Sequence, residues 1–410
     1  MKLSKPRADI NFLPFLDGAV LFHVATQRLW VLNSSQTFIW CWLEECTGIE
    51  QLAHKLSDTF DISLKQAKSD TQLAFDSLAG NGLLEGGSLL APSPEPAGQD
   101  LLAPLGHTVK PTLNETASSR LRLSILNTYI VITIEDPVLL GEMLRIYAPF
   151  LDEGVVPDAS SAELSLIVRA VSPGATGLNH FDILIDHQSL GLDISRERLV
   201  PYLVTAIFQK VSRQLGGQVA LHSAALTRAE TTLIFPANSG AGKSTLCAVL
   251  MSKGWGCLSD ELAILNPVEA LVTPLPLPMS IKSGSIDPLR RYYPELVSYP
   301  LHHRADGKQV RYLPIKTLDA VNKRDSYALS AIVLPTYSPG ENTKLLSVSK
   351  ITALEKITET GSSERLLTVE DIRSLISLIE KIPCYQLVYG STEEAADVLD
   401  AFVDGTYQVS

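Results

Sequence analysis

The chain has 410 residues, and its 45 acidic side chains outnumber its 34 lysines and arginines, which gives a formal net charge of −11. This excess of negative charge argues against nucleic acid as a partner bound through a basic face. Hydrophobic residues make up 45% and charged residues 19%, so the composition predicts two or three folded domains rather than a disordered chain. No apolar run reaches the roughly 18 residues of a membrane span, and no secretory signal is visible. We therefore expect a cytoplasmic protein with no membrane partner, whose five scattered cysteines pack as reduced side chains.

Residues 18–84 carry the pattern of one small domain. Apolar runs at 19–22 and 29–32 flank a polar turn, which predicts a β-hairpin. Three helix patterns follow. The first lies at about 36–45, the second starts at the capping-box spacing Thr47–Glu50, and the third covers 63–80. Leu83 and Leu84 are expected to form a short closing strand. A hairpin, three helices and a small strand predict a winged-helix-like α+β domain over residues 1–85.

Residues 86–117 lack an amphipathic period and are rich in proline and glycine, which predicts a linker. Strand and helix patterns mix from residue 118 onward. We divide this part into an N-terminal α/β part, 118–215, and a nucleotide-binding core, 216–410. Strands are expected at 121–126, 129–134, 164–168, 181–185, 219–226, 231–235, 256–258, 262–265, 329–334 and 385–389. Helices are expected at 138–150, 199–215, from 243, at 372–381 and at 393–402.

The most specific segment is Ala237–Thr245, which lies between the expected strand at 231–235 and the expected helix from Lys243. A strand, a glycine-rich loop, Lys-Ser and a helix in this order are the context of a phosphate-binding loop. Glycines let backbone N–H groups surround phosphate oxygens, and the helix N-terminus adds its positive end. Ala237 replaces the first glycine of the pattern, a mild change where φ is negative. The expected nucleotide-binding residues are Asn238, Ser239, Gly240, Ala241, Gly242, Lys243, Ser244 and Thr245, with Lys243 at the β- and γ-phosphates and the Ser244 hydroxyl on Mg²⁺.

Two carboxylates, Asp260 and Glu261, follow the expected strand at 256–258. Phosphoryl transfer needs a carboxylate near the phosphates, to hold Mg²⁺ or to accept a proton, although a solvated turn is the alternative. His222 lies on the expected strand beside the phosphate-loop strand, which would bring it near the γ-phosphate; a satisfied core histidine is the alternative. We therefore expect catalytic roles for Asp260, His222 and Lys243, and a metal site formed by Ser244, Asp260 and Glu261.

These motifs, in this order, resemble the HPr kinase/phosphorylase superfamily, which shares its P-loop fold with phosphoenolpyruvate carboxykinase. The match is carried by His222-Ser223, by Asn238–Ser244, by Lys253-Gly254 ahead of Asp260-Glu261, and by Pro274–Pro278 ahead of Lys282. The resemblance implies that Asp260 removes the proton of a seryl hydroxyl and binds the metal. Glu261 stands where the family has aspartate, and Lys282 either clamps phosphate or is a surface lysine. The expected fold class is thus α/β, a P-loop kinase core of this type preceded by the winged-helix-like domain.

The N-terminal segment resembles the PqqD-like peptide-recognition fold. The match lies in the hairpin at 19–32, the strand exit Leu32-Asn33, Ile39-Trp40, and the end from Leu78 to Gly82-Leu83-Leu84. The resemblance implies that a leader peptide binds as a β-strand added along the hairpin edge. A module that only packs on the kinase or mediates dimerisation is the alternative.

Together these patterns predict an ATP-dependent serine kinase that uses ATP and Mg²⁺. Its expected substrate is a peptide or small protein, in particular a ribosomally made precursor peptide that the N-terminal domain tethers. Two alternatives stay open: a kinase/phosphorylase of a carrier protein, and a non-catalytic, nucleotide-responsive binding protein. The HPr kinase family forms oligomers, so the resemblance also leaves a homo-oligomer open. No adenine-specific motif decides between ATP and GTP.

Overall fold

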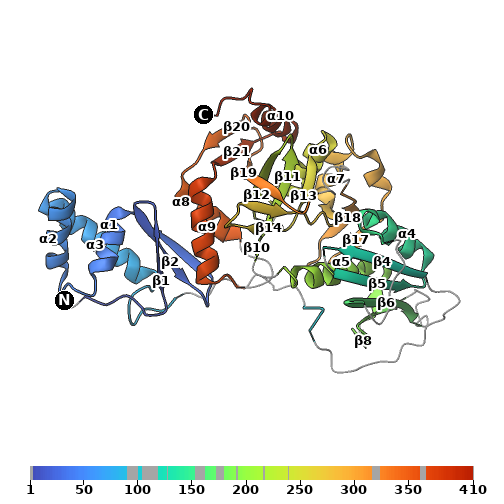
Figure 1. Cartoon of the computed structure of the whole chain (residues 1–410), viewed down its shortest axis with the longest axis horizontal. Helices are drawn as coiled ribbons and strands as arrows, with labels where there is room; N and C mark the ends of the chain where they lie inside the picture. Colours follow the sequence, from blue (N-terminus) through green and yellow to red (C-terminus); the bar gives the residue numbers. More distant parts are fainter. Residues whose placement is uncertain are drawn as a thin grey trace. The chain divides into compact units, whose positions relative to one another are not determined.

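The computed structural model describes residues 3–89, 100–103, 119–126, 128–152, 162–171, 180–190, 193–215, 218–238, 240–315, 324–360 and 366–409. The chain divides into two compact units (Figure 1). Unit 1 combines Met1–Pro96 with Ser349–Ile382, and unit 2 combines Ala97–Val348 with Pro383–Ser410. Most of the expected linker, residues 90–99 and 104–117, lies outside the described residues.

Unit 1 contains the hairpin and the three helices that the sequence predicts. Its strands β1 (Asn11–Phe15), β2 (Gly18–His23) and β3 (Arg28–Leu32) form an antiparallel sheet in that order, and α1 (Ser34–Trp42), α2 (Ile49–Phe60) and α3 (Leu64–Gly80) follow. Asn33 and Gln36 form a reciprocal capping box that starts α1 directly after β3. The expected closing strand is reduced to a single bridge between Pro6 and Leu84.

The middle strand β2 is buried on both faces. Ala19 and Leu21 belong to the core beneath α1–α3, so Val20 and Phe22, which are equally buried, point to the opposite face. The two remaining helices of unit 1 contact this sheet: α8 (Lys350–Thr360) contacts β3, and α9 (Val369–Lys381) contacts β1.

The side-chain amide of Gln27 forms two hydrogen bonds with the backbone of Leu367, just before α9. Its Nε2 donates to the Leu367 carbonyl at 3.0 Å, and its Oε1 accepts from the Leu367 N–H at 2.6 Å. Residues 349–382, which the sequence division placed within 118–410, therefore pack with the N-terminal unit. The physical reason is that α8 and α9 bury apolar side chains, such as Leu354, Ile357 and Ile376, which require cover.

Unit 2 begins with a sheet of order β4-β5-β6-β7-β8, with β9 paired to β7. Its elements are β4 (Ser119–Ile125), β5 (Thr128–Ile134), α4 (Pro137–Ile146), a 3₁₀ helix (Ala148–Phe150), β6 (Leu164–Val171), β7 (His180–Ile185), β8 (Gln188–Ser189), β9 (Ile194–Ser195) and α5 (Arg196–Ser212). The core of this sheet includes Ala220, Leu262 and Ile264, so the parts divided at residue 215 share one core. Leu101, from the expected linker, is buried in the same core.

The main sheet of unit 2 has the order β10-β14-β15-β19-β12-β11-β13, with β21 paired to β19 and β20 paired to β21. Its strands are β10 (Val219–Leu221), β11 (Ser223–Arg228), β12 (Thr231–Pro236), β13 (Gly256–Ser259), β14 (Ala263–Asn266), β15 (Leu271–Thr273), β19 (Tyr327–Tyr337), β20 (Lys344–Ser347) and β21 (Cys384–Tyr389). The strand expected at 219–226 is wrong at His222, where the chain leaves β14 and joins β12 and β13. Since β12, β19 and β21 are parallel, their carboxyl ends lie at one edge of the sheet.

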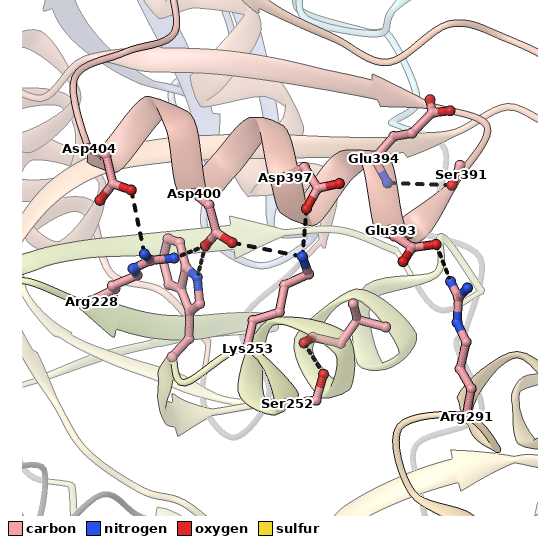
Figure 2. A network of polar contacts seen from close by, with 12 residues as sticks. Arg228, Ser252, Lys253, Arg291, Ser391, Glu393, Glu394, Asp397, Asp400 and Asp404 are labelled. Atoms are coloured by element: carbon pink, nitrogen blue, oxygen red, sulfur yellow. Dashed lines mark hydrogen bonds and ion pairs between the residues drawn. The ribbon is translucent and has the colours of Figure 1, made fainter.

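Further elements complete unit 2. A small sheet of order β16-β18-β17 consists of β16 (Met279–Lys282), β17 (His302–His303) and β18 (Gln309–Leu313), with α7 (Ser283–Leu289) and a 3₁₀ helix (Pro294–Ser298) between them. The helices α6 (Lys243–Ser252) and α10 (Thr392–Val403) lie side by side (Figure 2).

An ion-pair network joins α10 to the far end of α6 (Figure 2). Lys253 Nζ lies 2.5 Å from Asp397 Oδ1 and 4.0 Å from Asp400 Oδ2. Asp400 also accepts a hydrogen bond from the Trp255 indole at 2.7 Å and pairs with Arg228. Because Trp255 is fully buried, its N–H needs this acceptor. The Lys253-Gly254 segment therefore fixes the C-terminal end of α6 to α10.

Candidate functional site

The predicted phosphate loop joins β12 to α6 at the edge where the parallel strands β12, β19 and β21 end. Gly240 and Gly242 have φ angles of +96° and +82°, a region that strains residues with a Cβ. Ala237 has no positive φ, so the side chain that replaces the first glycine is accommodated. Ser239 lies outside the described residues. Glycines in this conformation are what a backbone needs in order to curl around phosphate oxygens.

Two charged groups are buried at this loop, and one polar atom of each has no hydrogen-bond partner among the described residues. Lys243 opens α6 and is 8% exposed, and its Nζ has no partner. Asp260 directly follows β13 and is 4% exposed, and its Oδ1 has no partner. Buried polar atoms without partners are costly, and a bound ligand would satisfy them. Lys243 has the chemistry to bind phosphate, and Asp260 has the chemistry to bind a metal ion or accept a proton.

The surroundings of Asp260 shift the pKa of its carboxyl group. Burial is the main cause that raises its pKa to about 6. The positive charge of Lys243 lowers the pKa, and the negative charge of Glu261 raises it further. The Ser244 hydroxyl donates a hydrogen bond to this carboxylate, so the helix that carries Lys243 also brings Ser244 to Asp260. A carboxylate with a pKa near neutrality can accept a proton in one step and release it in the next.

His222 and Glu261 form a second pair. His222 Nε2 lies 3.6 Å from Glu261 Oε1, and the side chain of Glu261 is 54% exposed. Desolvation raises the pKa of Glu261, but pairing with His222 and the charges of Lys243 and Arg304 outweigh it, and the pKa falls to about 2. Glu261 therefore stays ionised beside the imidazole, while its neighbour Asp260 titrates near neutral pH. Adjacent carboxyls with pKa values pushed apart are typical of acid–base sites.

A group of cations adds positive charge near Glu261. Lys282 ends β16, and burial, followed by the charges of Lys308 and Arg304, lowers its pKa. Asp306 lies 3.4 Å from the Arg304 guanidinium and 3.1 Å from Lys308 Nζ. Lys282 was predictable from the sequence, whereas Arg304 and Lys308 were not, because they flank the turn between β17 and β18, which has no motif of its own.

The structure thus brings His222, Lys243, Ser244 and Glu261 around Asp260, and all four influence its pKa. Thr245, by contrast, directs its hydroxyl to Ser285, 2.8 Å away. Burial raises the thiol pKa values of Cys247 and Cys257 far above their usual range, as expected for packing residues.

A different surface lies along β3 in unit 1. Within the described ranges, no strand pairs with its outer edge. Leu29, Trp30 and Val31 are half-buried there, which leaves apolar side chains at an open backbone edge. The adjacent α1 carries Phe38, which packs edge-on against Phe60 with ring centroids 5.6 Å apart. Open strand edges with apolar surroundings can accept an extended peptide as a further strand.

Neither a membrane span nor a dense metal cluster is found among the described residues. Among the helices described, none is both long and apolar enough to cross a membrane. No cluster of three or more His, Cys, Asp or Glu side chains suited to a metal ion occurs in the described part of the chain. The Ser244 hydroxyl and the Asp260 carboxylate fit the oxygen preference of Mg²⁺, which commonly keeps waters and phosphate oxygens as its other ligands.

The family model described as Coenzyme PQQ synthesis protein D (PqqD) matches residues 18–84. The chain is also similar to the solved structure titled "TbiB1 in Complex with the TbiA(beta) Leader Peptide", at 24% identity, covering 20% of this chain and 98% of that chain, with a TM-score of 0.19. No curated protein matches the chain. On the family match and the observed hairpin and helices, residues 18–84 form a PqqD-like domain.

Proposed function

We propose that this protein is an ATP-dependent kinase that phosphorylates a serine hydroxyl of a ribosomally made precursor peptide held by the PqqD-like domain. The observation that carries the kinase proposal is the pair of buried, unpartnered groups, Lys243 Nζ and Asp260 Oδ1, at a strand–glycine loop–helix junction. The PqqD-like domain, with the open edge of β3, supports a peptide as the acceptor.

In the proposed reaction, Lys243 and the loop backbone bind the β- and γ-phosphates of ATP. Mg²⁺, held by Ser244 and Asp260, would neutralise charge on the phosphate oxygens. Asp260 accepts the proton of the seryl hydroxyl as the seryl oxygen bonds to the γ-phosphorus and the bond to the β-phosphate oxygen breaks, which releases ADP. His222, oriented by Glu261, donates a hydrogen bond to an oxygen of the transferring group.

The test is phosphorylation of a candidate serine-containing precursor peptide with its leader segment, followed by mass spectrometry in single-turnover experiments with Mg²⁺ and ATP. Lys243→Ala should lower the rate by orders of magnitude. Lys253→Ala is the matched control, since this lysine follows the other end of α6 and pairs with α10. Asp260→Asn should retain ATP binding and lose phosphotransfer. Full activity in Lys243→Ala or in Asp260→Asn would refute the assigned roles.

The tethering role has its own test. Removing the N-terminal segment of the peptide should raise KM and leave kcat nearly unchanged, because the lost contacts are uniform binding contacts remote from the serine. An unchanged KM would refute peptide tethering. ATP binding without turnover would favour the nucleotide-responsive binding protein, and dephosphorylation of the product would favour the kinase/phosphorylase.

A further inference from the structure

Two tyrosines end the parallel strands beside the phosphate loop. Tyr337 is the last residue of β19 and Tyr389 the last of β21, and the two are paired in register. Both strands run parallel to β12, whose carboxyl end leads into the loop. Ligands of α/β sheets bind beyond the carboxyl ends of the strands, so the tyrosines lie on the ligand side of the sheet.

Tyr389 supports the loop from within the protein. It is fully buried, and its hydroxyl donates to the Ala241 carbonyl at 3.5 Å. A Cβ added to Gly242 would lie 2.8 Å from this hydroxyl, so the loop backbone rests directly on the phenol. The position of Tyr389 is thereby fixed by the loop and by the sheet.

Tyr337 has the opposite character, since it is 49% exposed. Its ring packs against that of Tyr389, with centroids 5.5 Å apart and planes tilted by 54°. Its Cβ lies 3.7 Å from the Cβ position built on Gly242, so it stands immediately beside the loop. The aromatic ring is thus backed by a buried neighbour and half open to solvent next to the phosphate-binding backbone.

The segment after Tyr337 is held in place as well. The Ser338 N–H donates to the Tyr389 carbonyl at 2.8 Å. Gly390 allows the turn to pack closely, because a Cβ there would lie 2.6 Å from the Glu341 carbonyl oxygen. A ring anchored on both sides loses little conformational entropy when a flat ligand stacks on it.

We propose that Tyr337 is the stacking platform for the base of the nucleotide whose phosphates the loop holds, a role that rests on the proposed nucleotide-binding function. A nucleotide extends from its phosphates toward the base, and the exposed aromatic ring beside Gly242 offers a π-face within the same edge of the sheet. Stacking recognises the base without hydrogen bonds to its edge, in keeping with a sequence that has no adenine-specific motif.

The experiment compares two probes by calorimetry on the full chain with Mg²⁺: ADP, which has a base, and tripolyphosphate, which has none. The wild type should bind both, ADP more tightly. Tyr337→Ala should weaken ADP binding about 5- to 100-fold and leave tripolyphosphate binding within about twofold. Tyr337→Phe keeps the ring and should bind ADP like the wild type.

Three outcomes overturn the platform: unchanged ADP affinity in Tyr337→Ala, an equal loss of both probes, or a loss in Tyr337→Phe as large as in Tyr337→Ala. A wild type that binds neither probe refutes the proposed function itself, which separates that failure from failure of the platform alone.

Discussion

Replacing Asp260 by asparagine should stabilise the unliganded protein. The carboxyl is 4% exposed, and burial raises its pKa from 3.8 to about 6. This shift of about two pKa units, at about 1.4 kcal/mol per unit, corresponds to a destabilisation of about 3 kcal/mol at neutral pH. The attraction of Lys243 is already included in this shift, but the asparagine amide needs hydrogen-bond partners at a buried position. The expected net gain in the free energy of unfolding is therefore about 1–3 kcal/mol.

The sign of the pH dependence follows from the direction of the shift. The folded protein holds the Asp260 proton more tightly than the unfolded chain does, so stability falls as pH rises from about 4 to about 6. Thermal melts without nucleotide or metal should show a larger gain for Asp260→Asn at about pH 7.5 than at about pH 4.5.

Glu261→Gln is the control with the opposite expectation. The pKa of Glu261 is lowered in the folded protein, so its contribution is present at neutral pH and is lost only as pH falls through about 2. Glu261→Gln should thus lower the melting temperature at neutral pH, by a small amount because the side chain is 54% exposed. A drop in Asp260→Asn at neutral pH as large as in Glu261→Gln would refute the reasoning.

Asp400→Ala should destabilise unit 2 by about 2–4 kcal/mol in thermal melts, because the Trp255 indole and its cationic neighbours lose their acceptor, whereas Asp404→Ala, at a half-exposed position, should cost less than about 1 kcal/mol. Equal effects would contradict the network. Gly242→Ala should abolish tripolyphosphate binding measured by calorimetry, since φ is +82° and the Cβ meets a buried hydroxyl; retained affinity would contradict this loop geometry. Deleting Met1–Pro96 alone should cause aggregation in size-exclusion chromatography by uncovering α8 and α9, and replacing Ser349–Ile382 by a short Gly-Ser linker in the same variant should restore a monodisperse protein. A soluble single deletion would show that the cover is dispensable.

Local features were predictable from the sequence. The glycine-rich loop proposed to bind phosphate, its flanking strand and helix, and the N-terminal hairpin depend on short-range patterns, and β12, α6, β2 and β3 lie where those patterns place them. Ser244 lies within hydrogen-bond reach of Asp260 because the start of α6 and the end of β13 meet at one edge of the sheet.

Strand partners and the packing of distant segments were not predictable in the same way. The strand pattern runs without a break through His222. Nothing in the local sequence therefore shows that β10 pairs with β14 whereas β11 pairs with β12 and β13. Residues 349–382 lie between β20 and β21 in the sequence, and only packing assigns them to unit 1. One sequence feature did indicate that β2 is covered on both faces: Ala19–Phe22 is a continuous apolar run, which is typical of such a strand.

The glutamate at position 261 can be understood from side-chain length. Asp260 and Glu261 follow the same strand end, but the first is buried against Ser244 and the second is half exposed and within 3.6 Å of His222. A glutamate is one methylene longer than an aspartate, which allows its carboxylate to approach the imidazole from an exposed position. Shortening it by Glu261→Asp should therefore weaken the hold on His222 and leave the environment of Asp260 nearly unchanged. In the proposed kinase, this predicts a lower rate of phosphoryl transfer, because His222 no longer assists it, while Asp260 still accepts the proton.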